Sequence, residues 1–251
     1  MGMKVLSIGN SFSQDSHKWL HRLAEKNGID VETVNLYVGG CSLERHWNNV
    51  LTNNPEYALE SNGSRAERYV SIDEALGMMK WDVVTLQQAS PLSGRPQSYF
   101  PYLQNLADLI RERQPEAKIC FVQTWSYEID RESSSFNAYN RDQKEMFRRI
   151  ADASEMASKV IDAPIIPVGE VIQRIRETVP AFDYQNGGMS LNRDGFHLTL
   201  DYGRFAAAAT WFCKLTDSRI KLDEFEDFDM SIINAIVEVV EDIVLKESTE
   251  E

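Results

Sequence analysis

The sequence predicts an α/β fold in which a five-stranded, mostly parallel β-sheet lies between two layers of helices. Short apolar runs alternate along the chain with longer segments whose apolar residues recur at helical spacing. This alternation favours parallel strands joined by right-handed crossovers, with helices on both faces of the sheet. The 251 residues show no break in composition, so a single domain spanning residues 1–251 is expected.

The first half of the chain is expected to supply three of the five strands. Lys4–Gly9 is an apolar run that ends at a glycine, and Asp30–Gly39 and Trp81–Gln88 are similar in length and character. Ser16–Gly28 has helical apolar spacing and a glycine that stops the helix. Ser42–Leu51 predicts a short helix with Ser42 as its N-cap.

The second half of the chain supplies the other two strands and the longer helices. Ala117–Gln123 and Ala163–Gly169 are the predicted fourth and fifth strands. Helices are predicted within Pro96–Gln114, over Asn137–Ile161, Glu170–Thr178 and Leu200–Leu215, and near Met230–Lys246. Residues 247–251 form an acidic tail, which is expected to be disordered.

A hairpin signal interrupts this alternation at Tyr57–Val70. The pair Asn62 and Gly63 stands between two arms that alternate polar and apolar residues, which is typical of a type I′ turn. We expect this segment to be an inserted flap outside the five-stranded sheet. Ser71, followed three residues later by Glu74, predicts a capping box for a short helix.

The charge of the chain restricts the classes of partner. Lys and Arg number 26 against 39 Asp and Glu, so the net charge is −13. An acidic surface repels phosphate backbones and anionic lipids, so neither nucleic acid nor a membrane is an expected partner. Neutral ligands such as sugars remain open. No run is long enough to span a bilayer, and no leader pattern is evident. The chain as written suits the cytoplasm, or the periplasm or exterior if a leader was removed.

Cysteine and histidine spacing indicates no metal site or other cofactor. The three cysteines are far apart and show neither zinc spacing nor a disulfide framework. His17 and His21 are four residues apart on a predicted helix, but no third ligand is evident, so a solvated helix face is the favoured interpretation. Cys41 is interpreted as a small buried thiol rather than a nucleophile. No role is assigned to His46.

Polar side chains gather where the predicted strands end, at the edge where parallel sheets bind ligands. The first strand runs into GNSFS, which presents the Ser11 hydroxyl. Such a hydroxyl is a poor nucleophile unless a base stands beside it and a third group orients that base. Asp194 and His197 lie three residues apart near the end of the chain, with Gly195 between them. A tight turn at Gly195 would let the carboxylate accept from Nδ1 of the same histidine and leave Nε2 as the base.

These blocks resemble those of the SGNH/GDSL hydrolase superfamily. Gly9–Ser13 (GNSFS) resembles its first block, Gly-Asp-Ser-Leu-Ser, and Asp194–His197 (DGFH) resembles its last block, Asp-x-x-His. The resemblance implies a flavodoxin-like SGNH architecture, a serine hydrolase activity and a triad of Ser11, His197 and Asp194. It also implies that Gly40 donates a backbone N–H to the oxyanion hole, as the second-block glycine does.

The third block departs from this pattern. The superfamily usually has Gly-x-Asn-Asp there, and its asparagine donates to the oxyanion. This chain has Leu86-Gln87-Gln88-Ala89-Ser90, in which an ungapped match puts Ala89 at the asparagine position. Gln87 or Gln88 could supply the same amide on a longer side chain, and Gln88 is the favoured candidate.

The sequence and the resemblance together predict a serine esterase for a short acyl group, such as acetyl, on a carbohydrate. The predicted substrate-binding residues are Asn10, Trp125 and Tyr127. Trp125 and Tyr127 are chosen because aromatic rings at a site mouth suit sugars. Activity should fall in acid, because a protonated His197 cannot accept a proton.

Three other functions are alternatives to this esterase. One is a catalytically weak or inactive carbohydrate-binding member of the same fold, and another is a lipase or thioesterase. A nucleotide-binding domain is disfavoured, because no glycine-rich phosphate motif is present and the chain is acidic. The oligomeric state is left open.

Overall fold

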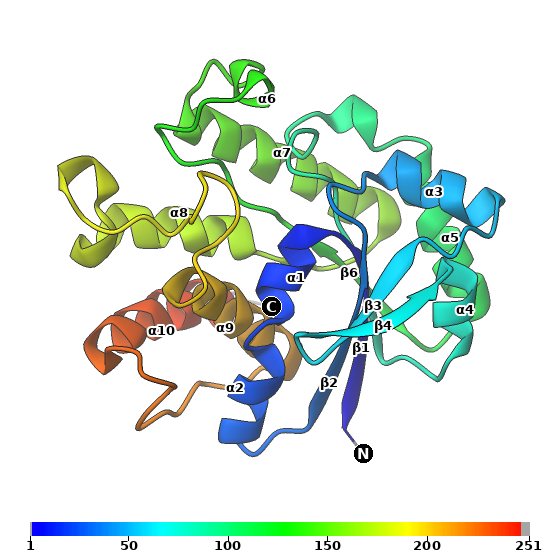
Figure 1. The fold of residues 1–251 in the computed structure, drawn as a ribbon, viewed down its shortest axis with the longest axis horizontal. Helices are drawn as coiled ribbons and strands as arrows, with labels where there is room; N and C mark the ends of the chain where they lie inside the picture. The colour runs from blue at the N-terminus through cyan, green and yellow to red at the C-terminus, as the bar shows by residue number, and fades with distance from the viewer. Residues whose placement is uncertain (1, 247–251) are drawn as a thin grey trace.

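The computed structural model describes residues 2–246, which form a three-layer α/β/α fold around one seven-stranded sheet (Figure 1). The strand order is β4-β3-β2-β1-β5-β6-β7. The strands are β1 Met3–Gly9, β2 Val31–Tyr37, β3 Tyr57–Ser61, β4 Ser64–Val70, β5 Val83–Leu86, β6 Lys118–Val122 and β7 Ile165–Ile166. The predicted tail over residues 247–251 lies outside the described residues.

The five predicted strands are confirmed as the parallel part of the sheet, β2-β1-β5-β6-β7. The prediction of five strands in total is wrong, because the hairpin belongs to the sheet. β3 pairs antiparallel with β2, with Leu36 opposite Leu59, and β4 pairs with β3 at the edge. The hairpin therefore completes the backbone hydrogen bonding of β2, which a separate flap would leave unpaired.

Helices cover both faces of the sheet. The helices are α1 Ser11–His17, α2 Leu20–Lys26, α3 Leu43–Leu51, α4 Ile72–Gly77, α5 Tyr102–Arg113, α6 Ser134–Asn137, α7 Gln143–Ile161, α8 Val168–Thr178, α9 Tyr202–Thr216 and α10 Met230–Val244. Figure 1 shows α3, α4 and α5 on one side of the sheet and α1, α2, α9 and α10 on the other. None of the helices among residues 2–246 is long and apolar enough to cross a bilayer.

The core consists of two apolar layers that the alternating strand residues separate. In β1, Leu6 and Ile8 face the layer under α3, α4 and α5, whereas Val5 faces the layer under α2, α8 and α9. The same alternation places Val84 and Val83 of β5 in different layers. Side chains of successive strand residues point to opposite faces, so a strand buried on both sides is apolar almost throughout.

Two predicted helix caps are confirmed, and one predicted helix is wrong. Ser42 caps α3, and Ser71 with Glu74 forms the expected capping box of α4. The single helix predicted over Ser16–Gly28 is wrong, since α1 ends at His17 and α2 begins at Leu20. Asp201 caps α9 by accepting from Tyr202 N, and the Thr199 hydroxyl accepts from the backbone N–H of Gly203.

Candidate active site

Ser11 stands at the carboxyl end of β1 as the first residue of α1. Asn10 is the N-cap, and its side chain accepts from the backbone N–H of Phe12 at 2.9 Å. Ser13 completes a capping box by accepting from Asn10 N at 2.9 Å. A Cβ on Gly9 would come within 1.9 Å of the Ser13 Oγ, so the turn from strand to helix requires glycine there. The sequence GNSFS thus builds a tight turn that presents the Ser11 hydroxyl.

Asn10 ties together the loops that follow three strands. Its Nδ2 donates to the carbonyl of Cys41 at 3.1 Å, and its Oδ1 accepts from Gln87 Nε2 at 2.7 Å. These loops follow β2 and β5, on either side of β1. Asn10 borders the Ser11 pocket, but its amide is engaged by protein groups. These contacts give Asn10 a positioning role, and its predicted contact with substrate stays a prediction.

The structure brings together the three side chains that the sequence singled out as a triad. Ser11 Oγ lies 2.9 Å from His197 Nε2, and His197 Nδ1 lies 2.7 Å from Asp194 Oδ2. The second carboxylate oxygen of Asp194 accepts from the backbone N–H of His197 at 2.8 Å and of Phe196 at 3.2 Å. Gly195 has a φ of +81°, which lets the chain turn between Asp194 and His197. This arrangement orients Nε2 towards the serine hydroxyl.

The Asp194 carboxyl should contribute to stability in a pH-dependent way. Burial alone would raise its pKa, but hydrogen bonds from the His197 ring and from the backbone of His197 and Phe196 outweigh burial, and the pKa falls below the ordinary 3.8. Because the folded-state pKa is lowered, the stabilisation is present above that ordinary value and is lost as pH falls through the folded value. In urea unfolding, the margin by which the wild type is more stable than Asp194→Asn should shrink as pH falls below about pH 4. A margin that does not shrink below about pH 4 would contradict this.

A buried aspartate holds the histidine loop onto α1. The Asp15 side chain is 0% exposed and accepts from Leu198 N at 2.9 Å, next to His197. It also pairs with Arg193 at 3.0 Å and with Arg204 of α9 at 2.8 Å. One carboxylate therefore joins the helix that carries Ser11 to the loop that carries His197. Sequence reasoning missed Asp15, because nothing in its neighbourhood along the chain shows that its partners lie about 180 residues away.

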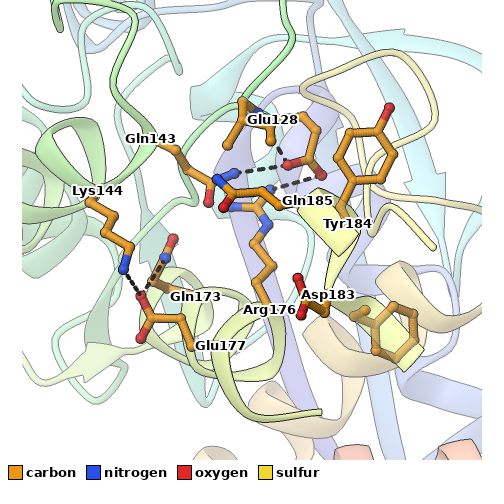
Figure 2. Close-up of a pocket in the computed structure, with 11 residues that line it drawn as sticks. Glu128, Gln143, Lys144, Gln173, Arg176, Glu177, Asp183, Tyr184 and Gln185 are labelled. Atoms are coloured by element: carbon orange, nitrogen blue, oxygen red, sulfur yellow. Dashed lines mark hydrogen bonds and ion pairs between the residues drawn. The ribbon is translucent and has the colours of Figure 1, made fainter. Parts of the chain in front are cut away.

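A second polar network, around Glu128 and Arg176, supports the loop that carries His197. Figure 2 shows Glu128 and Arg176 together in a pocket of about 350 Å³, with Gln143 donating to Glu128. Arg176 also donates to the side chain of Asn192, whose Nδ2 lies 3.4 Å from the His197 carbonyl. Arg176 and Glu128 are buried and 4.0 Å apart, so each compensates the charge of the other. The loop is thus fixed between two buried ion-pair networks.

Ser11 and His197 open onto a pocket of about 320 Å³. Gly40 lies in its wall, and a φ of +61° accounts for the glycine at this position. Within residues 2–246, the backbone N–H groups of Ser11 and Gly40 have no protein acceptor. Two backbone N–H groups without acceptors, on residues that border the same pocket as the Ser11 hydroxyl, can stabilise negative charge that develops on a substrate oxygen.

Neither glutamine supplies the expected amide to this pocket. Gln88 Nε2 donates to both the carbonyl and the hydroxyl of Ser98, and its Oε1 accepts from Leu43 N and Ala89 N. Gln87 Nε2 donates to Asn10 instead. Both side chains are almost fully buried, and neither borders the Ser11 pocket. The prediction of Gln88 or Gln87 as an oxyanion donor is therefore corrected, because their amides hold loops in place.

The two predicted aromatic substrate-binding residues differ in their placement. Trp125 is 1% exposed and stacks on Phe12 with ring centroids 3.9 Å apart, so its predicted substrate contact is wrong. Its Nε1 donates to the Phe196 carbonyl at 2.7 Å, which supports the turn before His197. Tyr127 does border the Ser11 pocket.

Several further side chains that sequence reasoning did not select as site residues border the pocket, among them Ser90, Arg131, Ser135 and Phe196. Phe196 lies between Asp194 and His197, and its ring centroid is 3.7 Å from that of His197. Ser90 directly follows the alanine that matches the superfamily's asparagine, a signal that could have been used. Arg131 comes from the loop after β6 and Ser135 from the short helix α6, a segment that has no recognisable motif.

The remaining histidines and Cys41 have the surroundings of structural residues rather than of catalytic ones. His17 is buried rather than on a solvated face, which corrects the prediction, and burial lowers its pKa to about 3. His46 is likewise buried; its Nδ1 lies 2.9 Å from the Tyr57 hydroxyl, and its pKa is lowered to about 3. Burial raises the pKa of the Cys41 thiol to about 12, which agrees with an inert buried thiol. His21 contacts the Val31 carbonyl.

Comparison with known proteins identifies the family and the fold. The sequence matches the family described as "Domain of unknown function (DUF4886)" over residues 4–237. A DUF4886 family protein from Bacteroides uniformis is 38% identical, with a TM-score of 0.90, covering 99% of this chain and 97% of that one. A protein from Slackia heliotrinireducens, proposed to be an SGNH hydrolase, is 20% identical with a TM-score of 0.57, covering 84% and 98%. The acetyl xylan esterase AlAXEase is 12% identical with a TM-score of 0.56, covering 83% and 98%.

The solved structures confirm that the chain has an SGNH hydrolase-like fold, as the sequence blocks predicted. No curated protein matches the sequence.

Proposed function

We propose that this chain, which belongs to the family described as Domain of unknown function (DUF4886), is a serine esterase that removes a short acyl group from a carbohydrate. The observation that carries the proposal is the pair of contacts from Ser11 to His197 at 2.9 Å and from His197 to Asp194 at 2.7 Å. They join a hydroxyl, a base and an orienting carboxylate, beside a pocket that opens to solvent.

In the proposed reaction, Ser11 attacks the ester carbonyl while His197 Nε2 takes the hydroxyl proton. Asp194 keeps the proton on Nδ1 and stabilises the imidazolium that forms. The imidazolium then protonates the departing alcohol, which leaves an acyl group on Ser11. Water, deprotonated by His197, attacks this acyl-enzyme, and the acid leaves as Ser11 regains its proton.

The proposed oxyanion hole consists of the backbone N–H groups of Ser11 and Gly40. Neither N–H group has an acceptor within the described protein, and both residues border the pocket. No glutamine amide joins them, and one missing donor costs about 3–4 kcal/mol in the barrier. We therefore expect turnover about a hundred- to a thousand-fold slower than in a hydrolase of this fold with the third donor.

The short acyl group and the carbohydrate rest on the size of the pocket and on one structural neighbour. A pocket of about 320 Å³ suits a small group rather than a long acyl chain. The acetyl xylan esterase AlAXEase shares the fold, although at 12% identity it supports the substrate only by analogy.

Hydrolysis of esters of increasing chain length tests the proposal. The purified protein should release acetate from an acetylated xylo-oligosaccharide and should cleave 4-nitrophenyl acetate about tenfold or more faster than 4-nitrophenyl octanoate. Faster cleavage of the octanoate, or of acetyl-coenzyme A, would favour a lipase or a thioesterase. No turnover of any acetyl ester would contradict the proposal.

A carbohydrate-binding protein without catalysis is the second candidate. The observation that favours it is the placement of Gln87 and Gln88, which leaves the pocket without a glutamine amide. It predicts saturable binding of a neutral oligosaccharide, measured by calorimetry, with no acetate released over hours.

A further inference from the structure

The pocket beside Ser11 contains one guanidinium and no carboxylate. Arg131 borders the pocket, and none of the 39 Asp and Glu residues of the chain does so among those described. Apart from the titratable His197, Arg131 is therefore the one residue of the Asp, Glu, Lys, Arg and His types among the described residues that line this pocket, although the chain as a whole has a net charge of −13. A cation placed at the entrance to a nucleophile attracts anionic substrates and repels cationic ones.

Contacts within the protein hold the Arg131 side chain in place. Its guanidinium lies 4.0 Å from the ring centroid of Phe196 and 4.8 Å from that of Tyr127. Nε donates to Ser133 Oγ at 3.3 Å, and Nη1 donates to the Asp194 carbonyl at 2.9 Å. These contacts fix the plane of the guanidinium next to the Asp194–His197 turn, which reduces the entropy lost when it binds a ligand.

The same side chain keeps binding capacity that the protein does not use. Within residues 2–246, Nη2 of Arg131 makes no hydrogen bond, and no carboxylate lies within the 4.0 Å ion-pair distance of the guanidinium. Each of the arginines on the opposite side of the histidine loop, Arg193 and Arg204, has a carboxylate partner in Asp15. A planar guanidinium with unused N–H groups matches a carboxylate in shape and charge.

A row of hydroxyl groups extends the site from Arg131 along the pocket. Ser133 Oγ lies 3.1 Å from Ser135 Oγ, Ser135 Oγ lies 3.3 Å from the Tyr127 hydroxyl, and that hydroxyl lies 3.3 Å from Ser90 Oγ. Hydroxyl protons rotate, so these groups can donate to an anion or accept from a sugar hydroxyl. The Ser90, Tyr127 and Ser135 side chains therefore add hydrogen-bonding groups to the pocket that Arg131 borders.

We propose that the substrates of this site carry a carboxylate, and that Arg131 binds this carboxylate beside the Ser135 hydroxyl while Ser11 attacks the ester. The proposal rests on the esterase function proposed above and narrows its substrate class to acidic esters. The carboxylate can belong to the alcohol part, as in an acetylated sugar acid, or to the acyl part, as in a dicarboxylic acid half-ester.

Two matched substrate pairs test the proposal and separate these sources. The first pair is a mono-acetylated methyl glucuronoside and the corresponding methyl glucoside; the second is 4-nitrophenyl hemiglutarate and 4-nitrophenyl valerate. The wild type should show a kcat/KM about tenfold or more higher for the charged member of at least one pair, and that pair identifies the source. Equal kcat/KM within both pairs would overturn the proposal and leave the esterase function intact.

Variants at Arg131 separate charge recognition from support of the triad. Arg131 also donates to the Asp194 carbonyl, so Arg131→Gln should slow the hydrolysis of all substrates. The readout is therefore the kcat/KM for the charged substrate divided by that for the neutral substrate. In Arg131→Gln this ratio should fall to near one. Arg131→Lys should keep part of the preference through its charge. Arg148→Gln makes the same change on exposed α7 and should leave the ratio unchanged. A preference that survives in Arg131→Gln would refute the role of Arg131.

Binding keeps the proposal testable if the protein cleaves none of these esters. In that case the esterase function fails, and ligand-observed NMR on the wild type decides the fate of the anion site. Binding of methyl glucuronoside but not of methyl glucoside, lost in Arg131→Gln, would support a carboxylate site. Equal binding of both ligands, or of neither, would overturn it.

Discussion

Replacing Ser11 with alanine is expected to lower kcat for ester hydrolysis by a factor of about 10⁴ or more. Ser11 supplies the attacking oxygen, and no other hydroxyl in the described structure lies within hydrogen-bond distance of His197 Nε2. A water molecule in place of the hydroxyl lacks the advantage of a fixed nucleophile. Initial rates with 4-nitrophenyl acetate measure the effect.

Two controls make the Ser11→Ala result specific. Ser64→Ala is the same chemical change on the exposed hairpin strand β4 and should retain wild-type kcat. The thermal midpoint of Ser11→Ala should stay close to that of the wild type, because alanine is well tolerated in the first turn of a helix. If Ser11→Ala kept more than about a tenth of the wild-type rate, another residue would have to be the nucleophile.

Replacing Asp15 with alanine is expected to lower the free energy of unfolding by about 3 kcal/mol or more. The Asp15 side chain is fully buried, and its removal leaves Arg193, Arg204 and the Leu198 N–H without their acceptor. The estimate lies at the low end for buried pairs, because the Arg193 side chain is 30% exposed and can regain water. Urea unfolding followed by circular dichroism measures the change.

Matched variants show whether charge or shape at Asp15 is responsible. Asp15→Asn keeps an acceptor for Leu198 N but loses the charge, so it should be less destabilising than alanine and still clearly below the wild type. Asp227→Ala removes an exposed carboxylate and should change the free energy by no more than about 0.5 kcal/mol. An Asp15→Ala protein as stable as the wild type would show that α1 and the histidine loop do not depend on this carboxylate.

The meeting of Ser11 with His197 could be predicted from the sequence for two physical reasons. Parallel strands bring their carboxyl ends to one edge, so a serine after the first strand is placed there by topology. The Asp194–His197 contact is local, since one turn at Gly195 suffices to make it. Both the local turn and the sheet topology can be predicted from the pattern of residues along the sequence.

The pairing of the hairpin and the orientation of single side chains could not be predicted in this way. The alternation in Tyr57–Val70 is the same whether the hairpin stands alone or pairs with β2, and only the partner strand decides. Trp125 follows a strand end as a ligand-binding aromatic would, but the ring of Phe12 covers it. The amide of Gln88 could reach several acceptors, and in the structure it donates to Ser98, in the 3₁₀ turn Pro96–Ser98.

The carboxylates and guanidiniums around the histidine loop were also beyond sequence reasoning. Asp15, Glu128 and Arg176 are buried charges whose partners come from other elements of the fold. A charged residue in a sequence is normally interpreted as exposed, and only tertiary structure shows which charges are paired inside. Arg131 is the opposite case, a cation that the fold leaves without a carboxylate.

Labelling with a fluorophosphonate, followed by peptide mass spectrometry, tests the central claim most directly, since the reagent reacts with a hydroxyl activated by a neighbouring base. The wild type should carry one adduct, located on Ser11, and His197→Ala should react far more slowly. An unlabelled wild-type protein, or an adduct on any residue other than Ser11, would contradict the account.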